Sequence, residues 1–183
     1  MTEVLACTDV TRWESWLADH HEQSSGIWLL IAKKGSDEAS VSIGEALDVA
    51  LCYGWIDSQR KSHDTNCYLQ RYSPRRPRSP WSKRNVERVE ALIDAGRMRA
   101  PGLVEVAAAQ ADGRWAAAYE SQRNASLPPD LAAALEQNEP ARTAFEQLDK
   151  TGRYAIILPV LKATTPAMRI TRLQKAIAAL EAR

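Results

Sequence analysis

The prolines of this chain are confined to one part of it. All nine lie between Pro74 and Pro166, so the first 73 residues contain none. Proline has no backbone N–H to donate and has a fixed φ, so it interrupts central strands and helix interiors. The sequence therefore predicts two regions. An α+β domain over residues 1–80 holds the strands, and an Ala-rich helical domain over residues 81–183 follows it within one compact unit.

Hydrophobic patterning in the first region predicts a small, mostly antiparallel sheet of the β-α-β-β kind with helices packed on it. Asp9 is placed to cap a first helix. The unbroken apolar run of residues 27–31 is typical of a central strand that is covered on both faces. Ser42 and Glu45 have the spacing of a capping box, which predicts the start of a second helix.

A hairpin and a helical bundle are expected beyond that point. Residues 56–62 and 65–72 flank His63-Asp64, a sequence suited to the turn of a hairpin. The proline-broken link of residues 73–80 leads into the Ala-rich half, where short helices should form a bundle. Residues 154–161 are nearly all apolar and fit a buried helix or a buried strand, of which we favour the helix.

Composition places the chain among ordinary globular proteins. Its 183 residues are 45% hydrophobic and 26% charged, which excludes disordered and collagen-like classes. The three cysteines are an odd number without metal-ligand spacing, so a reducing compartment is the simplest setting. The N-terminus has no signal-peptide pattern, and no apolar stretch is long enough to span a bilayer. We therefore expect a soluble, cytoplasmic protein with no membrane insertion.

The near-neutral net charge of +1 conceals a charged segment. Residues 60–99 contain eleven basic and four acidic residues, a net charge of +7, whereas the remainder carries −6. Arginine outnumbers lysine there by nine to two, and its forked guanidinium suits carboxylate or phosphate better than lysine does. The run PRRPRSPWSKRN adds neutral donors, the ring of Trp81 and a helix start whose N–H groups favour an anion.

Two structural alternatives to an anion site stay open. The arginines could pair with carboxylates of the acidic helical half, or they could form a solvated face without a role. Asp57 lies three residues before Arg60 and four before Lys61, where it could act as a general base but fits an ion-pair partner better. The histidines offer no credible ligand set, so we expect no metal and no cofactor. Recognised nucleic-acid motifs are lacking, so a nucleic-acid partner is disfavoured.

The order of motifs resembles a known family. These motifs are GIWLLIAKK, EALDVALCYGWIDSQ, PRRPRSPWSKRNVERVEALIDAGRM, DGRWAAAY and PAMRITRLQKAI. Together they are similar to the bacteriocin-protection family, also called the YdeI or OmpD-associated family, over nearly the whole chain. This resemblance implies a role in tolerance of bacteriocins or cationic antimicrobial peptides, and it implies no settled activity. The signature positions that it implies are Trp55, Asp57, Ser58, Pro74, Arg75, Ser79, Trp81, Ser82, Asn85, Gly113, Arg114, Trp115, Arg169 and Arg172.

The leading hypothesis is a non-enzymatic module that binds a small anionic or phosphate-bearing ligand, with Trp81 as a lid or stacking surface. The alternatives are a small enzyme that uses Asp57 as acid or base on an anionic substrate, and a protein-interaction factor in stress tolerance whose partner the sequence does not identify. The candidate ligand-binding residues combine the basic segment with the positions that the resemblance implies. They are Trp55, Asp57, Arg71, Arg75, Arg76, Ser79, Trp81, Ser82, Lys83, Arg84, Asn85, Arg114, Arg169 and Arg172.

Overall fold

The computed structural model describes residues 4–23 and 25–182. The chain folds into two compact units. The first unit comprises residues up to Ser79 together with Val86–Gly113, and the second comprises Pro80–Asn85 together with the chain from Arg114 onward. The first unit thus takes in helical segments that lie beyond the domain boundary expected near residue 80.

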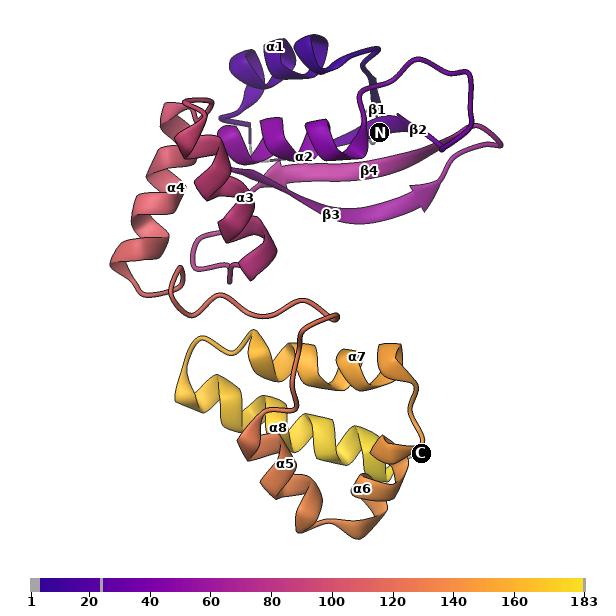
Figure 1. Cartoon of the computed structure of the whole chain (residues 1–183), viewed down its shortest axis with the longest axis vertical. Helices are drawn as coiled ribbons and strands as arrows, with labels where there is room; N and C mark the ends of the chain where they lie inside the picture. Colours follow the sequence, from indigo (N-terminus) through magenta and orange to yellow (C-terminus); the bar gives the residue numbers. More distant parts are fainter. Residues whose placement is uncertain (1–3, 24, 183) are drawn as a thin grey trace. The chain divides into compact units, whose positions relative to one another are not determined.

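The first unit is built on a four-stranded mixed sheet with the strand order β1-β2-β4-β3 (Figure 1). The strands are β1 (Val4–Ala6), β2 (Ile27–Ala32), β3 (Trp55–Ser62) and β4 (Cys67–Pro74). β2 pairs in parallel with β1 and antiparallel with β4, and β4 pairs antiparallel with β3. The predicted α+β class, the interior position of the second strand and the hairpin are confirmed, and β1 is an addition that the patterning did not reveal.

Eight helices accompany the sheet in the described part of the chain. They are α1 (Val10–His20), α2 (Ile43–Cys52), α3 (Lys83–Asp94), α4 (Ala100–Ala111), α5 (Pro129–Glu136), α6 (Glu139–Glu146), α7 (Lys150–Leu161) and α8 (Pro166–Glu181). The expected helix over residues 154–161 is confirmed as part of α7, with Pro159 in its last turn. No helix within the described ranges is both long enough and apolar enough to cross a lipid bilayer.

Local signals explain where the first two helices begin. The side chain of Asp9 accepts a hydrogen bond from the backbone N–H of Arg12, so it caps α1 as predicted. Ser42 and Glu45 form the complete capping box of α2, in which each side chain accepts a hydrogen bond from the other residue's backbone N–H. These bonds satisfy donors that a helix start would otherwise leave unpaired.

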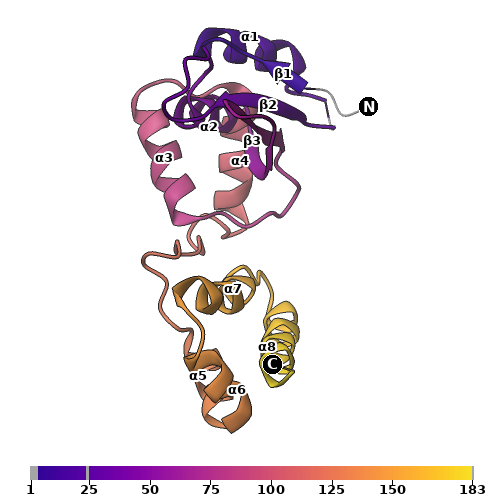
Figure 2. The ribbon, with the colours of Figure 1, turned by 90° about the vertical axis from the view of Figure 1, so that its right-hand side faces the viewer.

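One face of the sheet is covered by α1 and α2, which lie on the same side of the strands in both views (Figures 1 and 2). Trp13 of α1 contacts Tyr72 of β4, with 5.4 Å between the ring centroids, and both side chains are fully buried. Ile27 and Tyr72 are register partners, as are Leu29 and Gln70, so these side chains share that face. The core of the first unit therefore lies between these helices and the sheet.

Close backbone contact joins α4 to the end of α2. A Cβ atom added at Gly102 would lie 2.3 Å from the carbonyl oxygen of Cys52, closer than real Cβ contacts. Position 102 must therefore lack a side chain for the two helices to pack as they do. The contact places α4 beside the C-terminal end of α2. β3 starts at Trp55, only three residues after Cys52, so α4 also lies near the start of β3.

The second unit has a separate apolar core formed by α5 to α8. Its fully buried members include Leu131, Val160 and Leu180, which are at most 1% exposed. Ser82 and Tyr119, which form an isolated parallel β-bridge with each other, also belong to this unit. The helical bundle predicted for the end of the chain is therefore present in this unit.

Candidate functional site

A cleft of about 460 Å³ lies at the β3–β4 hairpin of the first unit and is called the hairpin cleft below. Residues of β3, of β4 and of the chain that follows β4 contribute to its wall. The lining residues are Ile56, Ser58, Gln59, Arg71, Ser73, Pro74, Arg76 and Ser79. The cleft thus joins two guanidinium groups with three hydroxyl groups and one amide.

A bulge in β3 shapes this wall. Asp57 pairs with Tyr72, and Arg60 pairs with Gln70, so two residues of β3 stand opposite the single Arg71 of β4. Regular strands alternate their side chains between the two faces, and an extra residue disturbs that alternation. The bulge therefore accounts for the presence of both Ser58 and Gln59 in the lining of one cleft.

The buried side chain of Gln70 stabilises the bulge. Its Nε2 donates to the backbone carbonyl oxygen of Gln59 over 3.1 Å, and its Oε1 accepts a hydrogen bond from Nε of Arg60 over 3.2 Å. Gln70 is only 3% exposed, so both of its polar atoms need partners inside the protein. The carbonyl oxygen of Gln59, which lies in the bulge, thus accepts a hydrogen bond from a side chain.

Arg71 is held firmly at its place in the cleft. Its Nη2 donates to the carbonyl oxygen of Ser25 over 2.6 Å, and its Cζ lies 5.7 Å from the ring centroid of Trp28. Lys61 lies over the same indole, with Nζ 4.4 Å from the centroid. A guanidinium has five N–H donors, so the bond to Ser25 leaves others for a ligand.

A tight turn carries the remaining cationic group. The backbone N–H of Ser79 donates to the carbonyl oxygen of Arg76 over 3.0 Å, and Arg78 between them has a φ of 60°. The side chain of Arg76 is exposed, whereas that of Ser79 is half-buried and accepts a hydrogen bond from Nη1 of Arg75 over 3.3 Å. The turn brings Arg76 and Ser79 to the same cleft.

The electrostatic character of the hairpin cleft is positive. None of its lining residues is acidic, and neither Arg71 nor Arg76 forms an ion pair with a carboxylate of residues 4–23 or 25–182. No group of three or more metal-ligating side chains occurs in this described part of the chain. The arrangement can therefore hold an anion by charge-assisted hydrogen bonds from guanidinium and by neutral bonds from hydroxyl groups.

Other members of the basic segment are neutralised internally. Arg88 and Arg97 both pair with Asp48 of α2, and Arg99 pairs with Glu14 of α1, with Nη2 2.6 Å from Oε1. These carboxylates belong to the first unit rather than to the acidic helical half. The two interpretations of the basic segment thus apply to different residues, because some arginines pair internally whereas those of the cleft do not.

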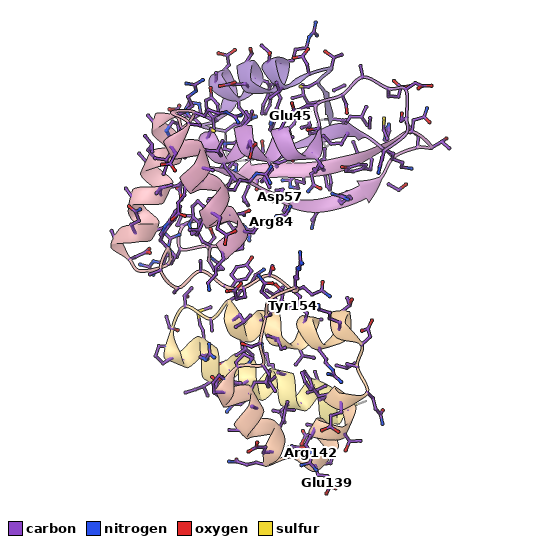
Figure 3. All side chains as sticks on the ribbon, in the orientation of Figure 1. Glu45, Asp57, Arg84, Glu139, Arg142 and Tyr154 are labelled. Atoms are coloured by element: carbon purple, nitrogen blue, oxygen red, sulfur yellow. The ribbon has the colours of Figure 1, made fainter. Side chains whose placement is uncertain are left out.

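Three candidate residues of the first unit lie away from the cleft lining. Trp55 is 1% exposed, and its Nε1 donates to the carbonyl oxygen of His21 over 2.8 Å, so it is a core residue. Arg75 is 7% exposed. Asp57, which Figure 3 labels on β3, is the register partner of Tyr72. Burial, and after it the charge of Asp57, raises the pKa of the Tyr72 hydroxyl.

The other candidate residues belong to the second unit. Trp81, expected as a lid or stacking surface, is 2% exposed and packs on Trp115 with 4.8 Å between ring centroids, so its ring belongs to a buried aromatic pair. Lys83 pairs with Glu120, and the backbone N–H of Asn85 donates to Oγ of Ser82 over 3.3 Å. The ammonium group of Lys83 and the backbone N–H of Asn85, both expected to attract an anion at this helix start, therefore already have partners.

The remaining candidates of the second unit differ in their surroundings. Arg114 is 9% exposed, and Arg84 is exposed at the start of α3 (Figure 3). Arg169 pairs with Asp130. Nη1 of Arg172 donates to the carbonyl oxygen of Pro159 over 2.7 Å. None of the four lines the hairpin cleft, whose walls are formed by residues of the first unit.

Sequence reasoning identified Arg71, Arg76 and Ser79 but missed Ile56, Gln59 and Ser73. The period of two along a strand could have indicated Ser73, because it lies two residues from Arg71. No local signal marks the bulge, since it depends on the register between two strands. Gln59 was therefore beyond a reading of the sequence alone.

Comparisons with known families divide the chain in two. Residues 5–105 match the family described as "Domain of unknown function (DUF8412)". Residues 124–183 match the family described as "Bacteriocin-protection, YdeI or OmpD-Associated". The second match confirms the suspected family for the C-terminal part, whereas the motifs GWIDSQ and PRRPRSPWSKRN fall within the first match.

No curated protein and no solved structure matches the chain. The family matches therefore supply its relationships, and the first of them covers more than half of its length. The chain belongs to the DUF8412 family through residues 5–105, and its residues 124–183 match the YdeI or OmpD-associated family.

Proposed function

We propose that this protein is a non-enzymatic module that binds a small anionic, phosphate-bearing ligand in the hairpin cleft. One observation carries the proposal. Arg71 and Arg76 line a single cleft that has no acidic residue in its wall, and neither is paired with a carboxylate of the described residues. Two such cations near one another repel, and an anion between them removes that repulsion.

The donor set favours a tetrahedral oxyanion. A guanidinium presents parallel N–H groups that match two oxygens of a phosphate group. The hydroxyl groups of Ser58 and Ser73 can donate to further oxygens from other parts of the wall. Such a mixed set of donors suits a ligand that has several acceptor oxygens.

The size and lining of the cleft favour a small ligand over nucleic acid. Its volume of about 460 Å³ is in the usual range of small-molecule sites. Bases of single-stranded nucleic acids stack on aromatic side chains, and no aromatic residue is among those that line this cleft. Trp81, which was the strongest candidate for stacking, is buried.

The lining of the hairpin cleft supports anion binding better than it supports acid or base catalysis by Asp57. An acid or base must lie within hydrogen-bond reach of its substrate. Asp57 is not among the lining residues, and its register partner is Tyr72, whose side chain faces the helices. The cleft itself contains cations, hydroxyl groups and one amide, which can hold an anion but have no evident proton acceptor near neutral pH.

The proposal includes a link to bacteriocin or antimicrobial-peptide tolerance and a place in the cytoplasm. Cationic peptides would be repelled by the hairpin cleft, so a role in tolerance would act through the anionic ligand. The buried cysteines Cys7, Cys52 and Cys67 are free thiols, the state that a reducing compartment maintains. Cell fractionation of the native host checks the location.

Calorimetric titration with inorganic phosphate and pyrophosphate tests the binding site. We expect saturable binding with one site per chain, weakened about tenfold or more in Arg76→Gln, because one charge-assisted bond contributes about 1.5–3 kcal/mol. Arg76 is exposed, so the melting temperature should change little. Arg71→Gln should weaken binding as well, with some loss of stability from its contact with Trp28.

A matched control separates site binding from general attraction. Arg12→Gln removes another exposed arginine, from α1, which does not line the hairpin cleft, and should leave the affinity unchanged. Equal weakening by Arg12→Gln and Arg76→Gln would show that only net charge matters. Absence of saturable binding by the unaltered protein would end the proposal.

A further inference from the structure

A second pocket, of about 470 Å³, lies in the helical unit and is called the α7 pocket below. One wall consists of Lys150, Arg153, Tyr154 and Ile157, all on α7. Their spacing of three, four and seven residues places them on one face of that helix. The facing wall includes Phe145 of α6 and Leu127 of the segment before α5.

The inner part of this pocket is apolar. Phe145 and Ile157 belong to the core cluster of the unit and are 8% and 6% exposed. Leu127 is 37% exposed, so part of its apolar surface remains accessible to a ligand in the pocket. An apolar group placed here would cover Leu127 and would extend the core.

The outer part carries two positive charges. Lys150 and Arg153 are both exposed, and neither pairs with a carboxylate among the residues that the structure describes. Arg153 is oriented by a hydrogen bond of 2.7 Å from Nη2 to the carbonyl oxygen of Glu146 and lies over Phe145, with Cζ 5.7 Å from the ring centroid. No acidic residue lines the pocket.

Tyr154 lies between these two parts. The hydroxyl of Tyr154, which Figure 3 labels on α7, donates to the carbonyl oxygen of Glu120 over 3.1 Å, and this bond restrains the ring. Burial raises the pKa of Tyr154, so the hydroxyl stays neutral at ordinary pH and adds no negative charge that would oppose an anion.

We propose that the α7 pocket binds a small amphipathic anion, namely a carboxylate attached to a short apolar chain or ring. The apolar part lies against Leu127 and Phe145, and the carboxylate lies at Lys150 and Arg153. This combination of an apolar floor with a few placed polar groups is the usual form of a small-molecule site. The inference does not depend on the hairpin cleft, since no residue lines both.

Calorimetric titration of the whole protein with decanoate tests the proposal. We expect one saturable site, and binding about tenfold or more weaker in the Lys150→Gln/Arg153→Gln double variant, because its charge-assisted bonds are lost. Decylammonium, which has the same chain and the opposite charge, should bind about tenfold or more weaker than decanoate. Acetate should bind about 100-fold or more weaker, because it lacks the buried chain.

Further variants distinguish the pocket from other sites. Arg142→Gln removes an exposed arginine of α6 that does not line the pocket and should leave decanoate binding unchanged (Figure 3). Leu127→Ser should weaken decanoate binding while the melting temperature shows that the fold persists. Arg76→Gln should weaken phosphate binding and leave decanoate binding unchanged, so the two proposals can fail separately. Equal binding of decanoate and decylammonium would overturn the inference.

Discussion

Arg169 forms two hydrogen bonds with the carboxylate of Asp130 and thereby ties α8 to the first turn of α5. Nη2 of Arg169 lies 2.9 Å from Oδ1 of Asp130, and Nε bonds to the other carboxylate oxygen. The resemblance implied that Arg169 belongs to the signature of the family. Its observed partner indicates that the residue serves the packing of the helical unit, which is a different use of a guanidinium from ligand binding.

Removal of this pair should destabilise the protein modestly. Both side chains are about one third exposed, so solvent screens the pair, and the bidentate geometry places the coupling at about 1 kcal/mol. A double-mutant cycle with Asp130→Asn and Arg169→Gln, followed by urea unfolding, measures it. The control cycle combines Asp130→Asn with Arg142→Gln, and these two substitutions should show no coupling. A coupling of zero in both cycles would contradict a structural role.

Stability should depend on pH through the same carboxylate. The hydrogen bond from Arg169 lowers the pKa of Asp130 below its usual value. A group with a lowered folded-state pKa contributes stability above about pH 4 and loses that contribution as the pH falls through the folded-state value. The difference in unfolding free energy between the unaltered protein and Asp130→Asn should therefore shrink on acidification. A difference that stays constant from about pH 6 to pH 3 would contradict this.

The bulge of β3 should depend on Gln70. Gln70→Leu leaves the carbonyl oxygen of Gln59 without its buried donor, so we expect a loss of about 1–3 kcal/mol in urea unfolding. The same variant should weaken phosphate binding in the hairpin cleft, although residue 70 does not line it, because the bulge positions two lining residues. Gln59→Ala keeps the carbonyl group and serves as the control for the backbone bond. Unchanged stability in Gln70→Leu would contradict the assigned role.

Two glycine substitutions should differ in their effect on the free energy of unfolding. Gly102→Ala brings a methyl group against the carbonyl oxygen of Cys52 and should cost about 2 kcal/mol or more, because backbone must shift. Gly44→Ala in α2 places its methyl group 3.5 Å from Nη2 of Arg88, an ordinary contact, and alanine favours a helix. We expect Gly44→Ala to leave stability unchanged or raise it by up to about 1 kcal/mol. Thermal unfolding of both variants checks the contrast.

Elements with local signals could be predicted from the sequence. The cap at Asp9 and the capping box of Ser42 and Glu45 depend on neighbours three residues apart, and both are confirmed. β1 has three residues and exists through parallel pairing with β2, more than twenty residues later. A strand that short has no periodicity to detect, so only the folded sheet reveals it.

The candidate site could be predicted only in outline. An excess of arginine indicated an anion site, and Arg71 and Arg76 indeed line one cleft. The sequence could not separate them from Arg99, which pairs with a glutamate 85 residues away. Nor could it reveal that Trp81 is buried, because its contact with Trp115 joins segments far apart in the chain. Long-range pairing decided which side chains remain accessible.

The packed rings of Trp81 and Trp115 constrain how such proteins can arise by gene rearrangement. The two family matches lie side by side in the sequence, as if they were exchangeable modules. The helical unit nevertheless includes Pro80–Asn85, six residues from inside the first match. A crossover between residue 105 and Trp115 would supply one indole from each parent, and the new pair would have to fit. Ancestral exchange of these halves is therefore expected to leave correlated changes at positions 81 and 115.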